Sequence, residues 1–355
     1  MKVHKAHLNS EQFDFPFVAE LPTLSTQAPR GGAKGVRSKR PVEGSPPVAI
    51  AQGASGDPES MAIALEATGD YRILRRLKPT MVWPELNNGP RQRIAILDTE
   101  TTGLDHTRDK VIELAMLCVD VDLASGIPVG EVIVYDGLED PGIPIPKEVQ
   151  EMTGITQDMV RGQRIEDESV LKLLADTDLV IAHNAGFDRP FCEGRLARFS
   201  SLPWACSLSD INWRGEGRTS AKLENLAQHL GFFYDAHRAE MDCHALLRVI
   251  TAQLPVTGRT ALSSLIQKAD KPSFRLYATN APYESKDVLK LRGYRWNAER
   301  RVWHMRLEDS AALDAECIWL KEKVYGNRSA FVQVEEFDAL TRYSSRNGLE
   351  SQQRL

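Results

Sequence analysis

The stretch of sequence that decides the fold is Arg93-Ile-Ala-Ile-Leu-Asp98-Thr-Glu100-Thr-Thr-Gly103. Its apolar run is typical of a buried strand, and it ends in two carboxylates placed two residues apart. Residues i and i+2 of a strand point to the same face, so Asp98 and Glu100 are expected side by side. Two such carboxylates repel each other and are costly to remove from water. A bound divalent cation is the simplest feature that makes the pair tolerable.

The segments that follow predict an α/β fold. Strands are expected at 93–98, 111–121 and 129–136, and the turns between them indicate an antiparallel meander. Helices are then expected at 146–153, 166–175, 188–199, 222–230 and 239–253, with short strands at 178–182 and 203–207. Strands first, then strands alternating with helices, indicate a mixed sheet covered by helices.

The chain has 355 residues, enough for two domains. Composition and turn signals divide it into six parts. These are a disordered N-terminal segment (1–56), a short helical lead-in and linker (57–90), a main domain (91–255), a linker with a short helix (256–272), a small α+β module (273–326) and a flexible tail (327–355).

Charge is distributed unevenly along the chain. The net charge is −5, but residues 91–254 hold 16 Lys and Arg against 27 Asp and Glu. Residues 268–328 hold 13 basic against 9 acidic residues, and residues 29–41 hold five basic residues and no acid. An acidic middle with basic flanks suits a metal-binding carboxylate core beside segments that hold a polyanion. An ordinary solvated surface explains any one of these segments equally well.

The cysteines and the apolar segments bear on location. The five cysteines are scattered without a C-x-x-C pair, so neither a disulfide framework nor a zinc knuckle is predicted. A reducing compartment follows, and we expect a cytoplasmic protein. No stretch reaches the roughly 18 apolar residues that a membrane span needs, so no membrane association is expected.

Two further motifs place acidic side chains near helix starts. His183-Asn-Ala-Gly-Phe-Asp188 follows a predicted strand, and its Arg189-Pro190 suits the first turn of a helix. His237-Arg-Ala-Glu-Met-Asp242 precedes an apolar helix. Carboxylate oxygens suit hard cations such as Mg²⁺ or Mn²⁺, and two such ions can clamp a phosphodiester. A neutral imidazole can take a proton from water at neutral pH. Each motif alone is weak evidence.

Together, in this order, the three motifs resemble those of the DEDDh family of 3′–5′ exonucleases. Met152-Thr-Gly-Ile-Thr156 is similar to the family's segment after its third strand, and Lys222-Leu-Glu-Asn-Leu-Ala-Gln-His-Leu-Gly231 to the helix before its third motif. The resemblance covers about residues 91–254. It implies a ribonuclease-H-like mixed sheet of five strands with helices on both sides. The chain departs from many relatives at Met152-Thr153, where they carry a histidine before Gly-Ile.

The resemblance also implies roles for individual residues. Two metal ions, Mg²⁺ or Mn²⁺, would be held by Asp98, Glu100, Asp188 and Asp242. His237 would be the general base, and nucleoside 5′-monophosphates would leave the 3′ end. Positions that meet the terminal nucleotide correspond to Thr101, Leu104, Asn184 and Phe187; Leu104 and Phe187 fit equally well as core residues. His183 is expected to hydrogen-bond structurally, and His244 to pack or lie at the surface.

The small module at 273–326 concentrates aromatic and basic residues. Strands are expected at 274–278 and 301–307 and helices at 284–291 and 309–324. Its stretch 290–303 resembles a short module of DNA-processing, plasmid and phage proteins. Interleaved aromatic and basic side chains suit single-stranded nucleic acid. The candidate contacts are Arg295, Trp296, Arg301 and Trp303, although the two tryptophans fit equally as the core of so small a unit.

The sequence therefore predicts a metal-dependent 3′–5′ exonuclease with an accessory nucleic-acid-holding module. The expected partner is nucleic acid with a free 3′ end, with single-stranded DNA preferred, and a polymerase or another replication or repair protein is a possible second partner. Two alternatives stay open. The substrate can be RNA, because the family includes both, or the chain can be a polymerase-associated adaptor that uses the fold mainly for binding.

Overall fold

The structure is a computed structural model that describes residues 56–86 and 89–355. The predicted disordered segment 1–56 lies outside the described residues except for residue 56, as does the basic run at 29–41. Among the described residues, all five cysteines are buried and free. No helix in the described part of the chain is long and apolar enough to cross a membrane.

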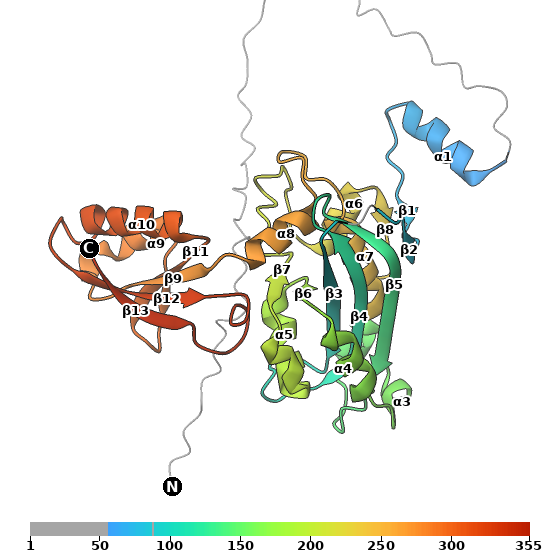
Figure 1. The fold of residues 1–355 in the computed structure, drawn as a ribbon, viewed down its shortest axis with the longest axis horizontal. Coiled ribbons are helices and arrows are strands. Elements are labelled where there is room, and N and C mark those ends of the chain that lie inside the picture. Colours follow the sequence, from blue (N-terminus) through green and yellow to red (C-terminus); the bar gives the residue numbers. More distant parts are fainter. Residues whose placement is uncertain (1–55, 87–88) are drawn as a thin grey trace, which may run out of the picture. The chain divides into compact units, whose positions relative to one another are not determined.

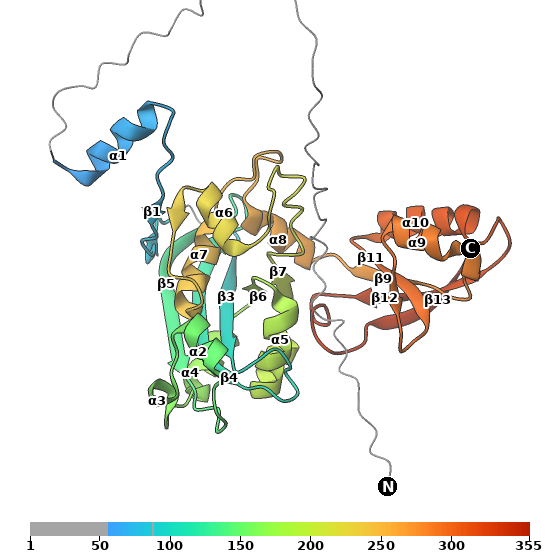
Figure 2. The same cartoon turned by 180° about the vertical axis from the view of Figure 1, so that it is seen from behind.

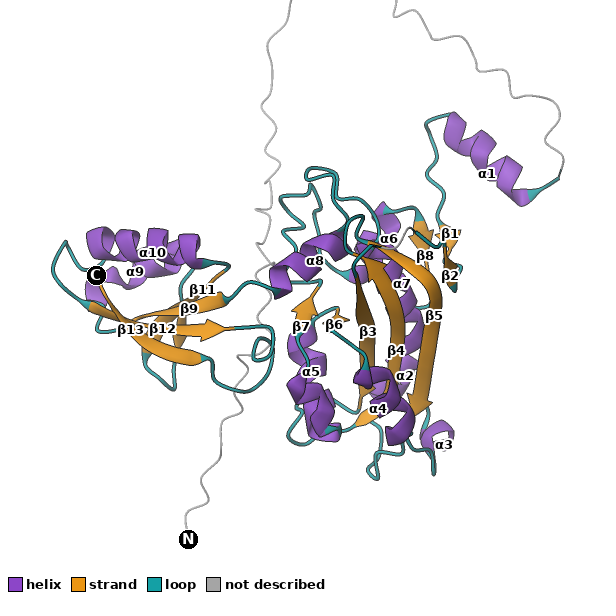
Figure 3. Ribbon diagram, viewed as in Figure 1, coloured by secondary structure: helices purple, strands orange, loops and turns teal. Residues whose placement is uncertain are grey.

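A mixed sheet of six strands organises the larger part of the molecule, in the order β2-β5-β4-β3-β6-β7 (Figure 1, Figure 3). Its strands are β2 (Val82–Trp83), β3 (Arg91–Thr101), β4 (Val111–Asp122), β5 (Ile127–Leu138), β6 (Leu179–Ala182) and β7 (Trp204–Cys206). β3, β4 and β5 form the predicted antiparallel meander, and β6 and β7 run parallel to β3. This is the strand order and direction of a ribonuclease-H-like sheet, which confirms the predicted fold class.

Helices cover both faces of this sheet because alternate residues of its central strands are apolar on both sides. Ile94 and Ile96 of β3 pack with helices α6, α7 and α8, whereas Ala95 and Leu97 pack with α4 and α5. In Figure 1 α4 lies in front of the sheet, and in Figure 2, seen from behind, α7 does. The helices of this part are α1 (Pro58–Ala67), α2 (Lys147–Thr153), α3 (Gln157–Val160), α4 (Asp167–Ala175), α5 (Ala185–Arg195), 3₁₀ helix η1 (Ala197–Ser201), α6 (Leu223–His229), α7 (Ala239–Ile250) and α8 (Ala261–Ala269).

Three short strands lie outside the five predicted strands. The sixth strand, β2, pairs at the sheet edge with β5. β1 (Arg75–Arg76) pairs in parallel with β8 (Phe232–Phe233). Both β1 and β2 fall in the predicted lead-in 57–90, and a two-residue strand has no periodicity that a sequence can reveal. Helix α8, within the predicted linker 256–272, packs into the core of the larger sheet.

Helix α5 begins earlier than predicted. The sequence indicates a helix at 188–199 with Arg189-Pro190 in its first turn, but α5 starts at Ala185 and Pro190 lies inside it. Asn184 adopts a left-handed conformation with φ of 84° directly after β6, and the Phe187 amide donates to the Asn184 carbonyl (2.7 Å). The chain therefore turns into the helix at once, and Asp188 lies within the helix rather than at its first residue.

A second sheet of five antiparallel strands forms the C-terminal part, in the order β10-β11-β9-β12-β13. Its elements are β9 (Ser273–Ala278), 3₁₀ helix η2 (Tyr283–Ser285), α9 (Lys286–Arg292), β10 (Arg295–Asn297), β11 (Val302–Leu307), α10 (Ser310–Lys323), β12 (Phe331–Phe337) and β13 (Leu349–Arg354). Residues of α9 and α10 form one core with the sheet, including Leu276, Leu289 and Leu320.

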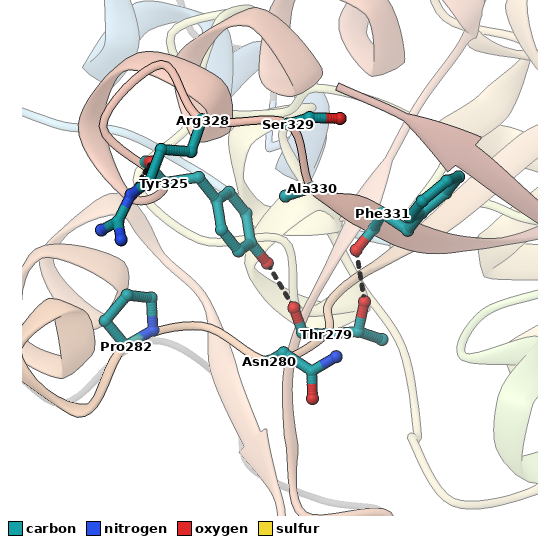
Figure 4. A pocket seen from close by; sticks show the side chains of 8 residues that line it. All are labelled: Thr279, Asn280, Pro282, Tyr325, Arg328, Ser329, Ala330 and Phe331. Carbon is teal, nitrogen blue, oxygen red and sulfur yellow. Dashed lines mark hydrogen bonds between the residues drawn. The ribbon is translucent and has the colours of Figure 1, made fainter.

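The prediction of a flexible tail over residues 327–355 is wrong. β12 inserts between β9 and β13, and Val332 and Val334 alternate into the core. In the run Phe331-Val-Gln-Val-Glu-Glu-Phe337 only residues 332–335 alternate between apolar and polar residues, so the sequence gives a weak signal for a strand. A pocket of about 370 Å³ lies at the end of this sheet (Figure 4), where the Tyr325 hydroxyl donates to the Thr279 carbonyl (2.7 Å). Its lining residues carry no carboxylate.

Candidate active site

Three of the four predicted metal ligands converge. Asp98 and Glu100 come from β3 and Asp242 from the first turn of α7, and one carboxylate oxygen of each lies within 4.8 Å of the others. The i, i+2 spacing on β3 places the first two on one face, and α7 packs against that same strand. Oxygen ligands at such spacing fit a divalent cation.

Asp188, the fourth predicted ligand, is not part of this group of three but adjoins it. It is 2% exposed, and its Oδ1 accepts hydrogen bonds from the Thr99 amide (3.2 Å) and the Thr99 hydroxyl (2.9 Å). Thr99 lies between Asp98 and Glu100 in the sequence. The residue that separates the two strand carboxylates therefore fixes the position of the helix carboxylate.

Asp242 is held by two donors that leave part of its carboxylate free. Oδ1 accepts from the Tyr234 hydroxyl (2.9 Å), and Oδ2 accepts from the Arg238 amide (3.2 Å). Groups that bond a metal ligand in this way orient it and tune its charge. Tyr234 carries no motif, and sequence reasoning did not single it out.

The carboxylates raise one another's pKa values. Burial, followed by the charges of Asp188, Asp242 and Glu100, raises the pKa of Asp98 well above its usual range. Burial, and then Asp242, raise the pKa of Glu100 to about 8. Burial raises the pKa of Asp188 to about 7, although the Thr99 hydrogen bonds oppose the shift. A bound cation would relieve this repulsion, so the cluster favours metal binding.

The metal-free protein is expected to lose stability as the pH rises. Carboxyls with a raised folded-state pKa bind protons more tightly when folded, so their contribution is complete below the unfolded pKa and is lost as pH rises through the folded pKa. The free energy of unfolding in chelator should therefore fall between about pH 4 and pH 8. Glu100→Gln should flatten this fall and stabilise the metal-free protein at pH 8 by about 2–4 kcal/mol. Urea unfolding across this range checks it, with exposed Glu131→Gln as the matched control. A parallel profile for Glu100→Gln and the parent protein would contradict it.

His237, the predicted general base, lies on the loop directly before α7 and is exposed. Its φ of 64° is in the left-handed region, which costs about 1–3 kcal/mol for a residue other than glycine. Burial raises the pKa of Asp242, and the hydrogen bond from Tyr234 and the neighbouring His237 oppose this rise. An exposed imidazole beside the carboxylate cluster is accessible to substrate and water.

Glu113 of β4 is a further site residue that sequence reasoning missed. It is fully buried and pairs with Glu100 across the β3–β4 register. Its Oε1 accepts from Arg238 Nε (3.0 Å) and Nη2 (2.8 Å), and its Oε2 accepts from the Ala239 amide (2.8 Å). Glu113 therefore ties down both residues that follow His237. The available signal was a carboxylate within the apolar run 111–121, which is costly without partners.

Glu113→Gln is expected to lower activity by about 10- to 100-fold, the effect of losing a group that orients a site residue. The loss of the ion pair with Arg238 should loosen the His237 loop. Hydrolysis rates under saturating metal check this, and exposed Glu224→Gln is the control. If the variant kept full activity while its stability fell, Glu113 would serve the fold alone.

The predicted substrate contacts lie in different environments. Thr101 is buried and its hydroxyl donates to the Gly103 carbonyl (2.5 Å). Leu104 is 63% exposed. Asn184 is the left-handed residue before α5, and Phe187 packs its ring on Phe191 with centroids 5.1 Å apart. Leu104 is thus a surface residue rather than a core residue, whereas Phe187 is half-buried.

The structure also shows the contacts of the two other histidines and of the predicted accessory residues. His183 Nδ1 is 2.7 Å from the Ser207 hydroxyl, and buried His244 packs within the core beside Glu240. In the C-terminal sheet, Trp296 is 47% exposed and its ring meets that of half-buried Trp303 edge-on at 5.5 Å. The other two predicted accessory contacts, Arg295 and Arg301, are exposed.

The known proteins that resemble this chain match the part that forms the larger sheet. Residues 95–250 match the family model described as exonuclease. The DNA polymerase III subunit epsilon of Treponema pallidum is 29% identical over 166 residues, which is 44% of this chain and 74% of that protein. The PolC-type DNA polymerase III of Thermotoga maritima is 34% identical over 176 residues, 48% of this chain but 12% of that protein. Against that of Clostridium perfringens (29% identical over 153 residues, 41% of this chain), the chain spans 10% of the relative's length.

Solved structures with some likeness are also exonucleases. Exonuclease X in complex with 5′ overhanging duplex DNA has 23% identity and a TM-score of 0.34, covering 48% of this chain and 99% of that one. E. coli exonuclease I in complex with a dA16 oligonucleotide has 17% identity and a TM-score of 0.37, covering 52% and 48%. The segment that matches the exonuclease family model, residues 95–250, is the one that carries the carboxylate cluster.

Proposed function

We propose that the chain is a metal-dependent 3′–5′ exonuclease that hydrolyses phosphodiester bonds and releases nucleoside 5′-monophosphates. The observation that carries this proposal is the convergence of Asp98, Glu100 and Asp242 within 4.8 Å, in the segment that matches the exonuclease family model. Buried carboxylates that raise one another's pKa are poor structural elements but good ligands for a hard cation.

The residues present fit two divalent ions, Mg²⁺ or Mn²⁺. Asp98, Glu100, Asp188 and Asp242 would hold them, and such ions supply Lewis acidity toward the scissile phosphate and the attacking water. Thr99 and Tyr234 keep Asp188 and Asp242 oriented through the hydrogen bonds described above. The set offers carboxylate oxygens alone, the ligand type that these ions prefer.

His237 would accept the proton of the attacking water at its ring nitrogen. Its loop is held through Arg238 and Ala239 by Glu113, so the exposed imidazole is tethered close to Asp242. A positioned base of this kind contributes about 10²- to 10⁴-fold to a rate. Thr101, Leu104, Asn184 and Phe187 would contact the terminal nucleotide.

DNA is the proposed substrate, with single strands preferred over duplex and DNA over RNA. This rests on the similarity of residues in the exonuclease domain to polymerase III proteins. A polymerase or another replication or repair protein is the corresponding proposed partner, and a cytoplasmic location is part of the same proposal.

The C-terminal sheet is proposed as an accessory module that holds nucleic acid, beginning near residue 273. Arg295, Trp296 and Arg301 are exposed on β10 and the β10–β11 turn, and Trp303 lies beside Trp296. An exposed indole with neighbouring guanidinium groups can stack on a base and contact phosphates. Because β12 and β13 belong to this sheet, the proposed module extends to Arg354 rather than ending at 326.

Trp296→Ala is expected to raise KM for a long single-stranded oligonucleotide by about 5- to 100-fold, the effect of losing one stacked base. kcat should not change, because the chemistry takes place elsewhere. Steady-state kinetics on long and very short oligonucleotides check this, with exposed Leu291→Ala as the control. An equal loss on both substrates would contradict a holding role.

The test of the function is degradation of matched 5′-labelled single-stranded DNA and RNA in Mn²⁺. A ladder that shortens from the 3′ end and is stronger on DNA supports the whole proposal. A stronger ladder on RNA would make the chain an exoribonuclease. No degradation of either strand, together with no effect of Mn²⁺ on thermal stability, would favour the adaptor alternative.

A further inference from the structure

A loop of the C-terminal sheet contacts the helix that carries Asp188. We define the clamp loop as residues 338–346, which form most of the connection between β12 and β13. The guanidinium of Arg189, which is 0% exposed, donates to three carbonyls of this loop: Ala339 (3.0 Å), Arg342 (2.6 Å) and Leu340. Arg189 directly follows Asp188 on α5.

Arg189 also has contacts outside the clamp loop. Its Nε donates to Glu193 one turn along α5 (2.7 Å), and its guanidinium lies over the Trp204 ring at 5.5 Å from the centroid. A guanidinium removed from water needs partners for its donors, and those that remain unpaired carry a large cost. Three of its acceptors belong to the clamp loop, so α5 depends on the loop to satisfy this charge.

Further hydrogen bonds join the clamp loop to the same region. The Trp204 amide of β7 donates to the Ala339 carbonyl (2.8 Å), and the Tyr343 hydroxyl donates to Asp210 (2.6 Å). Arg346 Nη2 donates to Glu193 Oε1 (3.0 Å) and to the Ser200 carbonyl (3.1 Å). The loop therefore contacts the sheet edge, α5 and the segments that follow each of them.

Helix α5 is consequently held at neighbouring residues. Asp188 is bonded to Thr99 of β3, and Arg189 is bonded to the clamp loop. Adjacent side chains on a helix diverge by about 100°. The helix is therefore held from two different sides at two consecutive residues, one of which is Asp188.

We propose that the clamp loop positions Asp188 for metal binding, with Arg189 as the positioning residue through which it acts. This inference rests on the proposed function, because it takes Asp188 as a metal ligand. It makes the C-terminal sheet part of the catalytic apparatus as well as a holder of substrate. The exonuclease domain then depends on a segment nearly 90 residues beyond its own last helix, α7.

The test uses the full chain, variants on both sides of the contact and one control variant. Arg189→Met removes the donors and keeps an unbranched apolar side chain. Tyr343→Phe and Arg346→Met remove hydrogen-bond donors that lie on the clamp loop itself. They are included because we expect them to fold even if Arg189→Met does not. Arg248→Met, on the exposed side of α7, is the control. The readouts are the Mn²⁺ concentration for half-maximal thermal stabilisation, and kcat and KM on an oligonucleotide.

Arg189→Met should raise the Mn²⁺ requirement about 5- to 10-fold, near the lower end of the range for groups that orient a ligand. kcat at limiting Mn²⁺ should fall by the same factor, with KM unchanged and partial rescue by excess Mn²⁺. Tyr343→Phe and Arg346→Met should shift the requirement in the same direction by about 2- to 3-fold, and Arg189→Lys should restore part of the loss.

An unchanged Mn²⁺ requirement in the folded variants, with only the melting temperature lowered, would show that the loop stabilises the fold and does not position Asp188. The proposed function would survive that result. If the parent protein itself showed no response to Mn²⁺, the proposed function would fail and this inference with it.

Discussion

Replacement of Asp98 by Asn is expected to lower the rate of phosphodiester hydrolysis by at least about 10³-fold, the scale of removing one preorganised electrostatic group from an active site. Asn keeps the size of the side chain but removes the charge at the centre of the cluster, where Asp98 meets Glu100 and Asp242. The measurement is the initial rate on 5′-labelled single-stranded DNA in saturating Mn²⁺.

The same substitution should affect stability in opposite directions with and without metal. In chelator at pH 8 the variant should be more stable than the parent protein, because one of the repelling carboxylates is gone. In Mn²⁺ it should lose most of the stabilisation of about 2–3 kcal/mol that a site gains at roughly 100 times its Kd. Asp176→Asn, at an exposed carboxyl beyond α4, is the matched control. Full activity in Asp98→Asn would overturn the assignment of the site.

Replacement of His237 by Asn is expected to lower kcat by about 10²- to 10⁴-fold, the usual contribution of a general base. Asn is chosen because His237 has a φ of 64°, and Asn adopts this left-handed conformation more readily than most residues. The loss can then be attributed to the imidazole rather than to a rearranged loop. Steady-state kinetics at several pH values check it.

The response to Mn²⁺ should distinguish His237→Asn from Asp98→Asn. His237→Asn should keep the stabilisation by Mn²⁺, since imidazole is not among the proposed ligands, and its residual rate should rise steadily with pH as hydroxide replaces the missing base. His229→Asn, at the last turn of α6, serves as the control. If His237→Asn lost its response to Mn²⁺, the histidine would be a ligand instead of a base.

The predicted strands and the central carboxylates illustrate what local sequence can reveal. The sequence predicts β3, β4 and β5 near their observed positions because each is a long apolar run bounded by turn residues. The side-by-side placement of Asp98 and Glu100 follows from strand periodicity alone. The sequence predicts a start of α5 that is too late. Arg189-Pro190 is typical of a first helical turn, whereas the left-handed turn at Asn184 has no comparably strong sequence signal.

Other features depend on partners that are distant in the sequence. The sequence predicts a tail at β12 because three of its seven residues are polar, and only pairing with β9 and β13 makes it a strand. Glu113 meets Arg238 across 125 residues, and Arg189 meets the clamp loop across about 150. No local pattern encodes such contacts.

The sequence by itself determined the fold class of the larger sheet and the identity of three carboxylates that meet there, because periodicity and motif order are local properties of the chain. Only the tertiary structure decided what orients them: Thr99 on Asp188, Tyr234 on Asp242, and Glu113 on the His237 loop. It alone joined the clamp loop to α5. The physical reason is that a buried charge selects its partners by distance and geometry, which arise when the chain packs.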